Sequence, residues 1–494
     1  MTGRHLAQIA RYPAQVTGHL AQIARRAAAV SVPATITAIV GGAALVGSAG
    51  LAACSSGPPP RPSPPPPIAN PSPVPGRTLS VADWPTYGHD AGRSGAAAGV
   101  RPAGTLRVAW RRRLDGAVYA QPLVVGGVVV AATEGGSIYA LNAQNGKVLW
   151  RTHIAAPVQL TDLPCGDIGP LGITGTPVYD PATGLVFAVA ETTGGTHLLA
   201  GVNLTTGEVK VRRDIEPPRG TPIATQQRPA LTLYGRRVYI AFGGLDGDCA
   251  YYVGSVVSVA TNGLGAVGAY SVPTSREGGI WATGGAVVVG NRLLVSVGNG
   301  ASTSSYDGSD SVIALSPGLR RLDLFAPSSW ANENANDLDL GSMTPAVAGG
   351  YVFVAGKSGT GYVLRTTRLG GIGGEVAQVR NLCAGFGTGA VSGAVVYVPC
   401  SNSGIRQVTI DADGTPHAGW TAQAAQAHGS PVTGGGAVWV VDYNGGVLYA
   451  LDPADGSIRA SADIGTAPHF AAPSLSGSHA YIGTLTGVVA VGGA

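Results

Sequence analysis

The 494-residue sequence lacks the short motifs that mark several enzyme classes. It has no G-x-S-x-G nucleophile elbow and no C-x-x-C-H haem attachment site. Its nine histidines are scattered, and none stands at the spacing of a zinc site. A G-x-G-x-x-G string at Gly263–Gly268 lies in a glycine-rich, strand-rich region with no helix pattern after it. We therefore expect no serine hydrolase, no covalent haem, no zinc site and no dinucleotide loop.

Acidic residues are missing from the start of the chain, where the first is Asp83. Four arginines come before an apolar run of small residues that ends at position 53. A basic stretch followed by an apolar run and small residues is the layout of an export signal. Leu51-Ala52-Ala53-Cys54 matches a lipobox, so we expect residues 1–53 to be a signal segment and Cys54 to carry lipid. A plain transmembrane anchor is the alternative, although prolines and glycines interrupt the run.

Net charge is also missing beyond that leader. Four of the 31 basic residues and none of the 27 acidic ones precede Cys54, which leaves 27 of each sign. A neutral chain without a basic stripe argues against nucleic acid as a partner. Residues 55–77 contain 11 prolines and should form extended polyproline that spans roughly 70 Å. We expect residues 54–83 to be a stalk that holds a domain on the extracytoplasmic face of the cell membrane.

Five cysteines leave four in the exported part of the chain. In an oxidising compartment an even number suggests two disulfides, with three possible pairings. We favour Cys383–Cys400, which could bridge a strand edge within one structural unit, and by elimination Cys165–Cys249. Neither pair has the spacing of a metal site.

A repeat organises the rest of the sequence. Ala140–Trp150 follows a valine-rich run and a Gly-Gly turn, and it contains a second turn at Asn145-Gly146. Alternating apolar residues on both sides of such turns predict antiparallel strands. Similar units open with a small or polar residue and a proline at six positions, which are Gln121, Thr176, Arg228, Thr344, Ser430 and Ala472.

Two wide gaps between these positions each hold one further strand signal, at 285–289 and 388–391. Eight units of about 50 residues predict an all-β, eight-bladed β-propeller. The last unit is too short for four strands, so we expect the strand at Leu106–Leu114 to close the ring by pairing with it. Seven blades with one long insertion is the alternative.

The spacing A-x-N-x-x-N-G-K-x-x-W at Ala140–Trp150 resembles the tryptophan-docking repeat of quinoprotein alcohol dehydrogenase-like propellers, usually called PQQ repeats. The resemblance covers roughly residues 84–494 and implies the propeller fold. Trp150 is the one tryptophan that we expect to dock. A shared fold does not fix a function.

The same resemblance implies a site for pyrroloquinoline quinone and Ca²⁺ on the propeller axis. Its residues would be Trp281 stacking on the quinone, Lys357 beside it, Glu191 and Asn299 on Ca²⁺, and Asp339 or Asp337 as the base. The adjacent cysteine pair that packs on the quinone in many alcohol dehydrogenases is missing. Each residue could also fill an ordinary core or turn position.

Three functions follow from these observations. The first is a lipid-anchored binding or scaffold module that holds an envelope protein or a small ligand, with no certain cofactor. The second is a Ca²⁺- and quinone-dependent dehydrogenase of alcohols or sugars that passes electrons to a separate carrier. The third is a purely structural assembly factor.

Overall fold

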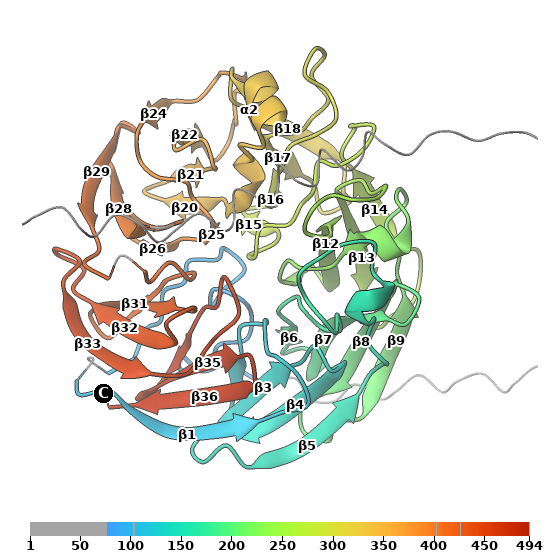
Figure 1. Ribbon diagram of the computed structural model, residues 1–494, viewed down its shortest axis with the longest axis vertical. Helices are drawn as coiled ribbons and strands as arrows, with labels where there is room; N and C mark the ends of the chain where they lie inside the picture. Colours follow the sequence, from blue (N-terminus) through green and yellow to red (C-terminus); the bar gives the residue numbers. More distant parts are fainter. Residues whose placement is uncertain (1–76, 102–103, 402, 425, 494) are drawn as a thin grey trace, which may run out of the picture. The chain divides into compact units, whose positions relative to one another are not determined.

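The computed structural model describes residues 77–101, 104–401, 403–424 and 426–493. Eight antiparallel sheets are arranged in a ring around a central axis, and the prediction of an eight-bladed propeller is confirmed (Figure 1). Each blade runs outward from a short inner strand to an exposed outer strand. The inner and middle strands are buried because blades pack face to face, whereas the outer strand β5 alternates exposed and half-buried residues.

In each of the first four blades the four main strands follow one another along the chain, and blades 3 and 4 each carry one additional short strand. Blade 1 is β2 (Leu123–Val125), β3 (Val128–Ala132), β4 (Ser137–Asn142) and β5 (Val148–His153). Blade 2 is β6 (Val178–Asp180), β7 (Leu185–Thr192), β8 (Thr196–Asn203) and β9 (Val209–Asp214). Blade 3 is β11 (Thr232–Tyr234), β12 (Arg237–Gly244), β13 (Ser255–Ala260) and β14 (Gly268–Ser271), with β10 (Thr225–Gln226) on β12. Blade 4 is β15 (Val287–Val289), β16 (Arg292–Val297), β17 (Ser311–Leu315) and β18 (Arg321–Ala326), with β23 (Gly371–Ile372) on β18.

The remaining blades complete the ring. Blade 5 is β20 (Ala346–Ala348), β21 (Tyr351–Ala355), β22 (Gly361–Arg365) and β24 (Ala377–Val379). Blade 6 is β26 (Ala390–Ser392), β27 (Val395–Cys400), β28 (Gly404–Ile410) and β29 (Pro416–Thr421). Blade 7 is β30 (Val432–Gly434), β31 (Ala437–Asp442), β32 (Val447–Leu451) and β33 (Ile458–Asp463). Blade 8 is β34 (Ser474–Ser476), β35 (His479–Thr484), β36 (Gly487–Gly492) and β1 (Arg107–Arg113).

Short elements lie between the blades. They are the 3₁₀ turns η1 (Leu160–Asp162), η2 (Pro222–Ala224) and η3 (Leu340–Ser342), the paired strands β19 (Met343–Thr344) and β25 (Gly387–Thr388), and the helix α2 (Trp330–Asn336). Within the described residues, no helix has the length and apolar character needed to span a membrane.

Ring closure follows the expected route. β1 pairs antiparallel with β36, from Arg107 opposite Gly492 to Arg113 opposite Gly487. The outer strand of blade 8 therefore comes from the start of the propeller sequence, and pairing of β1 with β36 closes the ring. A closed ring leaves no large sheet edge for another chain to pair with.

Tryptophan docking is more frequent than the sequence indicated. Trp150 donates from its indole nitrogen to the Leu204 carbonyl of the next blade at 2.9 Å, as the repeat predicted. Trp110 in β1 and Trp420 in β29 make the same bond to Ala143 and Pro453, at 2.9 and 3.0 Å. The expectation of a single docking tryptophan was therefore wrong, because neither of these tryptophans follows the sequence spacing around Trp150.

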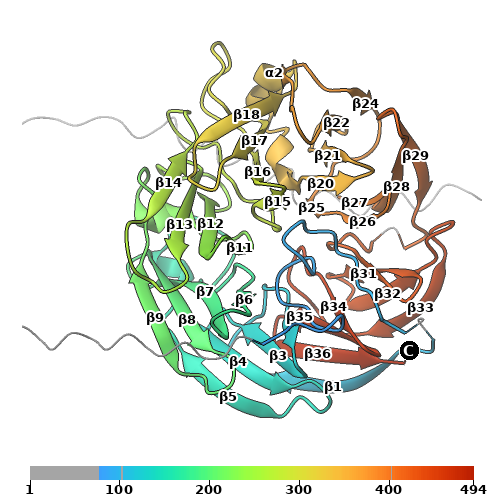
Figure 2. The ribbon, with the colours of Figure 1, turned by 180° about the vertical axis from the view of Figure 1, so that it is seen from behind.

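The segment before β1 has a role that the sequence did not reveal. Residues 84–97 run across the centre of one face of the ring (Figure 2). Their backbone bonds reach Val124 of blade 1, Val288 of blade 4 and Thr433 of blade 7. Arg93 is buried there and donates five hydrogen bonds, two of them to backbone carbonyls of other blades. We call this segment, which crosses the centre of the ring at one face, the closing segment.

Two disulfides form as predicted, Cys165–Cys249 and Cys383–Cys400. The first links the connection after blade 1 to a loop of blade 3, and the second lies at the end of β27. The expected signal segment 1–53, Cys54 and the stalk as far as residue 76 lie outside the described residues.

Candidate functional site

The repeat places one residue from each blade at an equivalent position near the axis. In every blade a turn joins the inner strand to the second strand, for example between Val125 and Val128 in blade 1. In each blade we take the residue six positions before the last residue of the inner strand, such as Tyr119 before Val125 in blade 1. We call these eight residues the axial ring. They are Tyr119, Thr174, Arg228, Thr283, Ser342, Phe386, His428 and Phe470.

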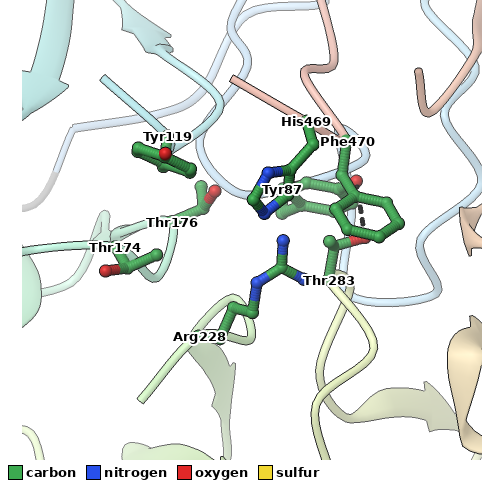
Figure 3. A pocket seen from close by; sticks show the side chains of 8 residues that line it. All are labelled: Tyr87, Tyr119, Thr174, Thr176, Arg228, Thr283, His469 and Phe470. Carbon is green, nitrogen blue, oxygen red and sulfur yellow. Dashed lines mark hydrogen bonds between the residues drawn. The ribbon is translucent and has the colours of Figure 1, made fainter. Parts of the chain in front are cut away.

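A pocket lies on the axis between members of this ring. Its lining includes five axial-ring residues together with Tyr87, Thr176 and His469 (Figure 3). Tyr87 belongs to the closing segment, and its hydroxyl lies 3.1 Å from that of Thr283. The cavity is small, about 20 Å³ or roughly the room that one water molecule needs, and it opens to solvent at its mouth. The pocket is thus a partly open cavity, with five blades and the closing segment contributing walls.

Arg228 is the charged group of this pocket. Its guanidinium carbon lies 4.3 Å from the centre of the Phe470 ring. His469 stands on the same wall, and burial together with Arg228 lowers its pKa to about 3. Burial also raises the pKa of Tyr119 to about 12. At neutral pH both are uncharged, so Arg228 supplies the charge of the lining.

The residues expected to hold a quinone lie together beside this pocket. Trp281 lies next to two glycines, Gly243 and Gly298, which stand at the end of the second strand of blades 3 and 4. A Cβ on Gly243 would lie 3.0 Å from the Trp281 Cβ, and one on Gly298 would lie 3.1 Å from its indole nitrogen. Lys357 stands 6.0 Å from the centre of the Trp281 ring.

An ion pair joins the predicted base to the predicted cation. Lys357 Nζ lies 2.6 Å from Asp339 Oδ2 and 2.7 Å from Asp337 Oδ1. The other oxygen of Asp339 accepts the backbone N–H of Asn299 at 2.6 Å. Burial raises the pKa of Asp339, and Lys357 opposes that rise. Asp337 instead ends helix α2 with its side chain 70% exposed. Five of the six expected residues therefore converge.

Glu191, the sixth, belongs to a different hydrogen-bonded network. Its Oε1 accepts the backbone N–H of Gln227 at 2.8 Å, and burial raises its pKa to about 7. Glu134 occupies the equivalent position in blade 1, where Oε2 accepts the N–H of Gly172 at 2.7 Å. Burial raises the pKa of Glu134 to about 8. No hydrogen bond among the described residues links Glu191 to Asn299 or Asp339.

The oxygen atoms of these side chains do not form a Ca²⁺ site. Ca²⁺ takes six to eight oxygen ligands, several of them carboxylate. Here both oxygens of Asp339 already accept donors, and Glu191 is held by blade 3. Within the described parts of the chain, no three His, Cys, Asp or Glu side chains are grouped as a metal would need. We derive no reaction step through a metal or quinone.

An aromatic cluster connects Trp281 to the pocket. The ring centre of Phe386 lies 6.2 Å from that of Trp281 and 6.1 Å from that of Phe470, on which it stacks. Both phenylalanines are axial-ring residues, from blades 6 and 8. Arg228 and Lys357 therefore lie against opposite parts of one aromatic surface.

Sequence reasoning missed Arg228, Phe470 and Tyr87 as site residues. Arg228 entered only as the residue before a proline that opens a repeat. Aligning the eight repeats on their inner strands would have placed Arg228 at the same position as the other axial-ring residues. Tyr87 carried no repeat signal, because it belongs to the closing segment.

Comparisons with known proteins agree with this fold. The family model described as outer membrane protein assembly factor BamB matches residues 102–291, from before β1 to the first turn of blade 4. None of the curated proteins matches the sequence.

Solved structures of two kinds are similar. Quinohemoprotein alcohol dehydrogenase ADHIIG from Pseudomonas putida HK5 is 13% identical with a TM-score of 0.65, over 84% of this chain and 80% of that one. Europium-containing methanol dehydrogenase is 13% identical with a TM-score of 0.61, over 83% and 98%. BamB from Moraxella catarrhalis is 15% identical with a TM-score of 0.56, over 78% and 99%. The chain is a β-propeller with PQQ-like repeats, similar in fold to both BamB and the quinoprotein dehydrogenases.

Proposed function

We propose that this protein is an exported, membrane-anchored binding module whose axial pocket receives a small ligand. One observation carries the proposal: five blades and the closing segment line a single cavity on the axis. Residues 84–97 cross the centre of one face and contribute Tyr87 to the lining, so in this proposal the ligand enters from the opposite face. A rigid scaffold with convergent side chains at one partly open cavity is the usual form of a binding site.

Two features support a location outside the cytoplasm. Both disulfides join cysteines of the exported part, and disulfides persist mainly in oxidising compartments. The basic and apolar leader with its lipobox at Cys54 supports a lipid anchor, and the proline-rich stalk supports a separation from the membrane.

The chemistry of the pocket supports binding over catalysis. A general base must be able to exchange a proton near the working pH. His469, with a pKa of about 3, and Tyr119, with a pKa of about 12, are both far from neutral pH. Asp339, the expected base of a dehydrogenase, has both oxygens engaged.

A thermal-shift screen of the full-length protein in detergent tests this proposal. The library contains amino acids, sugars, sugar acids and dicarboxylates, and pyrroloquinoline quinone with and without Ca²⁺. A ligand at 100 times its Kd stabilises the native state by about 2.7 kcal/mol, which raises Tm. We expect at least one compound other than the quinone to raise Tm.

A pocket-filling variant supplies the control. Thr283→Trp should abolish the shift, and Thr367→Trp, at an exposed position, should keep it. A Ca²⁺-dependent shift by the quinone alone would favour the dehydrogenase. No shift with any compound would refute a small-ligand module and leave an envelope protein as the partner.

A further inference from the structure

We infer that the axial pocket takes a small oxyanion, a carboxylate or a phosphate, which the guanidinium of Arg228 holds. This inference rests on the proposed binding function and specifies the chemical class of the ligand. It depends on three observations: Arg228 donates no hydrogen bond to the described residues, no carboxyl group is in direct contact with it, and a threonine hydroxyl lies in the same wall.

Arg228 is half-buried in the lining of the pocket and differs from Arg93, the buried arginine near the axis. Arg93 is 1% exposed and donates five hydrogen bonds to carbonyl and hydroxyl oxygens of the closing segment and neighbouring blades. Arg228 donates no hydrogen bond to the described residues, and its guanidinium lies over the face of Phe470. A guanidinium has five N–H donors, and those of Arg228 lie at a partly open pocket, where water or a ligand can accept them. The empty donors point to an acceptor that the chain does not supply.

No carboxyl group among the described residues forms an ion pair or a hydrogen bond with Arg228. Asp167 and Asp246 influence it only through space, and Asp167 lies 3.8 Å from the Nδ1 of His469. Glu134 is also close enough to interact with Arg228, but burial raises its pKa to about 8, so it is largely protonated at neutral pH. Asp167 and Asp246 therefore offset the charge of Arg228 only in part, from a distance and without a hydrogen bond to the guanidinium.

The wall opposite Phe470 offers hydroxyl groups. Thr174 is 5% exposed and lines the pocket; its Oγ1 makes no hydrogen bond of standard geometry in the described structure, although it lies close enough to Glu134 to lower the pKa of that carboxyl group. The hydroxyls of Tyr87 and Thr176 lie in the same lining. Figure 3 shows the guanidinium of Arg228 pointing into the space between these side chains. Hydroxyl donors beside a guanidinium form a suitable set for an oxyanion.

Phe470 adds specificity of orientation. Stacking on an aromatic ring fixes the plane of a guanidinium, and a fixed planar fork binds carboxylate or phosphate through two parallel hydrogen bonds. The limited space of the pocket restricts the ligand to a small molecule or to the anionic end of a longer one. Cations are repelled by the same charge.

Isothermal titration at pH 7 tests the inference with three probes: sodium acetate, sodium benzoate and inorganic phosphate. We expect at least one to bind the full-length protein with a Kd of about 1 mM or below. Comparing benzoate with phosphate distinguishes a carboxylate ligand from a phosphate ligand. Absence of saturable binding by all three would overturn the inference.

Variants of the arginine complete the test. Arg228→Gln should weaken binding at least about tenfold, because it removes the charge, and Arg228→Lys should retain part of it. Arg365→Gln, at an exposed position of β22, should bind like the wild type. Without anion, Arg228→Gln should also have an unchanged or higher Tm, since it removes an unpaired charge.

Two outcomes separate this inference from the proposed function. If Arg228→Gln binds the probes as tightly as the wild type, the anion site is refuted while the binding module stands. If Arg228→Gln and Arg228→Lys both unfold the protein, Arg228 is structural and the inference fails. If compounds of the library bind irrespective of their charge, the proposed binding function is supported and the anion site at Arg228 is refuted.

Discussion

Glu134 and Glu191 occupy the same position in consecutive blades, six residues after the inner turn, and each binds the backbone of the following blade. Glu134 accepts the N–H of Gly172, and Glu191 accepts that of Gln227. Each carboxyl group therefore ties its blade to the next one. Blade 5 carries Lys357 at this position, and blades 3 and 4 carry glycine. The same position of the repeat therefore links neighbouring blades in blades 1 and 2, supplies a cation in blade 5, and leaves room for Trp281 in blades 3 and 4.

These two acids make stability depend on pH. Burial raises the pKa of Glu134 from 4.5 to about 8 and that of Glu191 to about 7. Above pH 4.5 the unfolded carboxyls lose protons that the folded ones keep, so the folded state binds more protons. Each group therefore lowers the stability as pH rises, by up to about 1.4 kcal/mol per pH unit until its folded pKa.

Glu134→Gln isolates one of these contributions. The amide is a neutral isostere whose oxygen can still accept the Gly172 N–H. We expect the variant to gain stability over the wild type from pH 5 to pH 8, by a total on the order of 1–3 kcal/mol. Denaturant unfolding at several pH values measures this, with the exposed Glu208→Gln as control. A difference that is constant with pH would contradict the expected protonation.

The Lys357–Asp339 pair should be strongly coupled. The Asp339 side chain is 4% exposed, and Lys357→Met would leave its carboxylate buried without a cation. Removing one partner of a buried pair costs about 3–5 kcal/mol. Lys357→Met combined with Asp339→Asn should recover most of this loss, since the amide oxygen can still accept the Asn299 N–H.

Asp337→Asn is the matched control for that cycle. Asp337 contacts the same Lys357 nitrogen, but its side chain is 70% exposed, and exposed ion pairs contribute about 0–1 kcal/mol. The three free energies of unfolding come from urea titrations. If Asp337→Asn destabilised the protein as much as Lys357→Met, burial would not determine the strength of the pair.

Trp150 and Gly207 pack against each other, so the losses of stability caused by substituting them should be coupled. The indole lies against Gly207, where a Cβ would be 2.8 Å from the ring, and the backbone has a φ of +74°. Trp150→Ala removes the packing and the bond to Leu204, for about 2–4 kcal/mol. Gly207→Ala should be costly in the wild type and less so beside Trp150→Ala. A double-mutant cycle by thermal unfolding measures this coupling, and additive losses would argue against docking.

Local patterns in the sequence predicted most of the fold. The Pro-initiated runs and Asn-Gly or Asp-Gly turns recur with the period of one blade, so counting them gave eight blades and the closing strand β1. Trp110 and Trp420 escaped because docking needs only a ring above a turn of the next blade. That contact is set by the packing of blades and does not require the spacing seen around Trp150.

The candidate site was harder to predict because it is assembled across blades. Trp281, Asn299, Asp339 and Lys357 were found through their resemblance to a family motif. Arg228 has no distinctive neighbours in sequence, and what singles it out is the absence of an acceptor, which only the packed structure reveals. Tyr87 belongs to the closing segment, which lies outside the repeats, so the repeat pattern could not predict its place in the pocket.

The two disulfides should contribute unequally to stability. Cys165–Cys249 spans 84 residues and joins blade 3 to the connection before blade 2, whereas Cys383–Cys400 spans 17. Cross-linking restricts the unfolded chain more when the closed loop is longer, by about 4.5 kcal/mol for the first and about 3 kcal/mol for the second. We expect reduction of Cys165–Cys249 to lower the stability more, by about 1–2 kcal/mol. Two variants measure this, one with Cys383→Ala and Cys400→Ala, the other with Cys165→Ala and Cys249→Ala. Comparing each in oxidised and reduced form cancels the effect of the alanines on packing, and thiol titration verifies the redox state. An equal loss in both would mean that the unfolded chain keeps blades 2 and 3 close together without the bond.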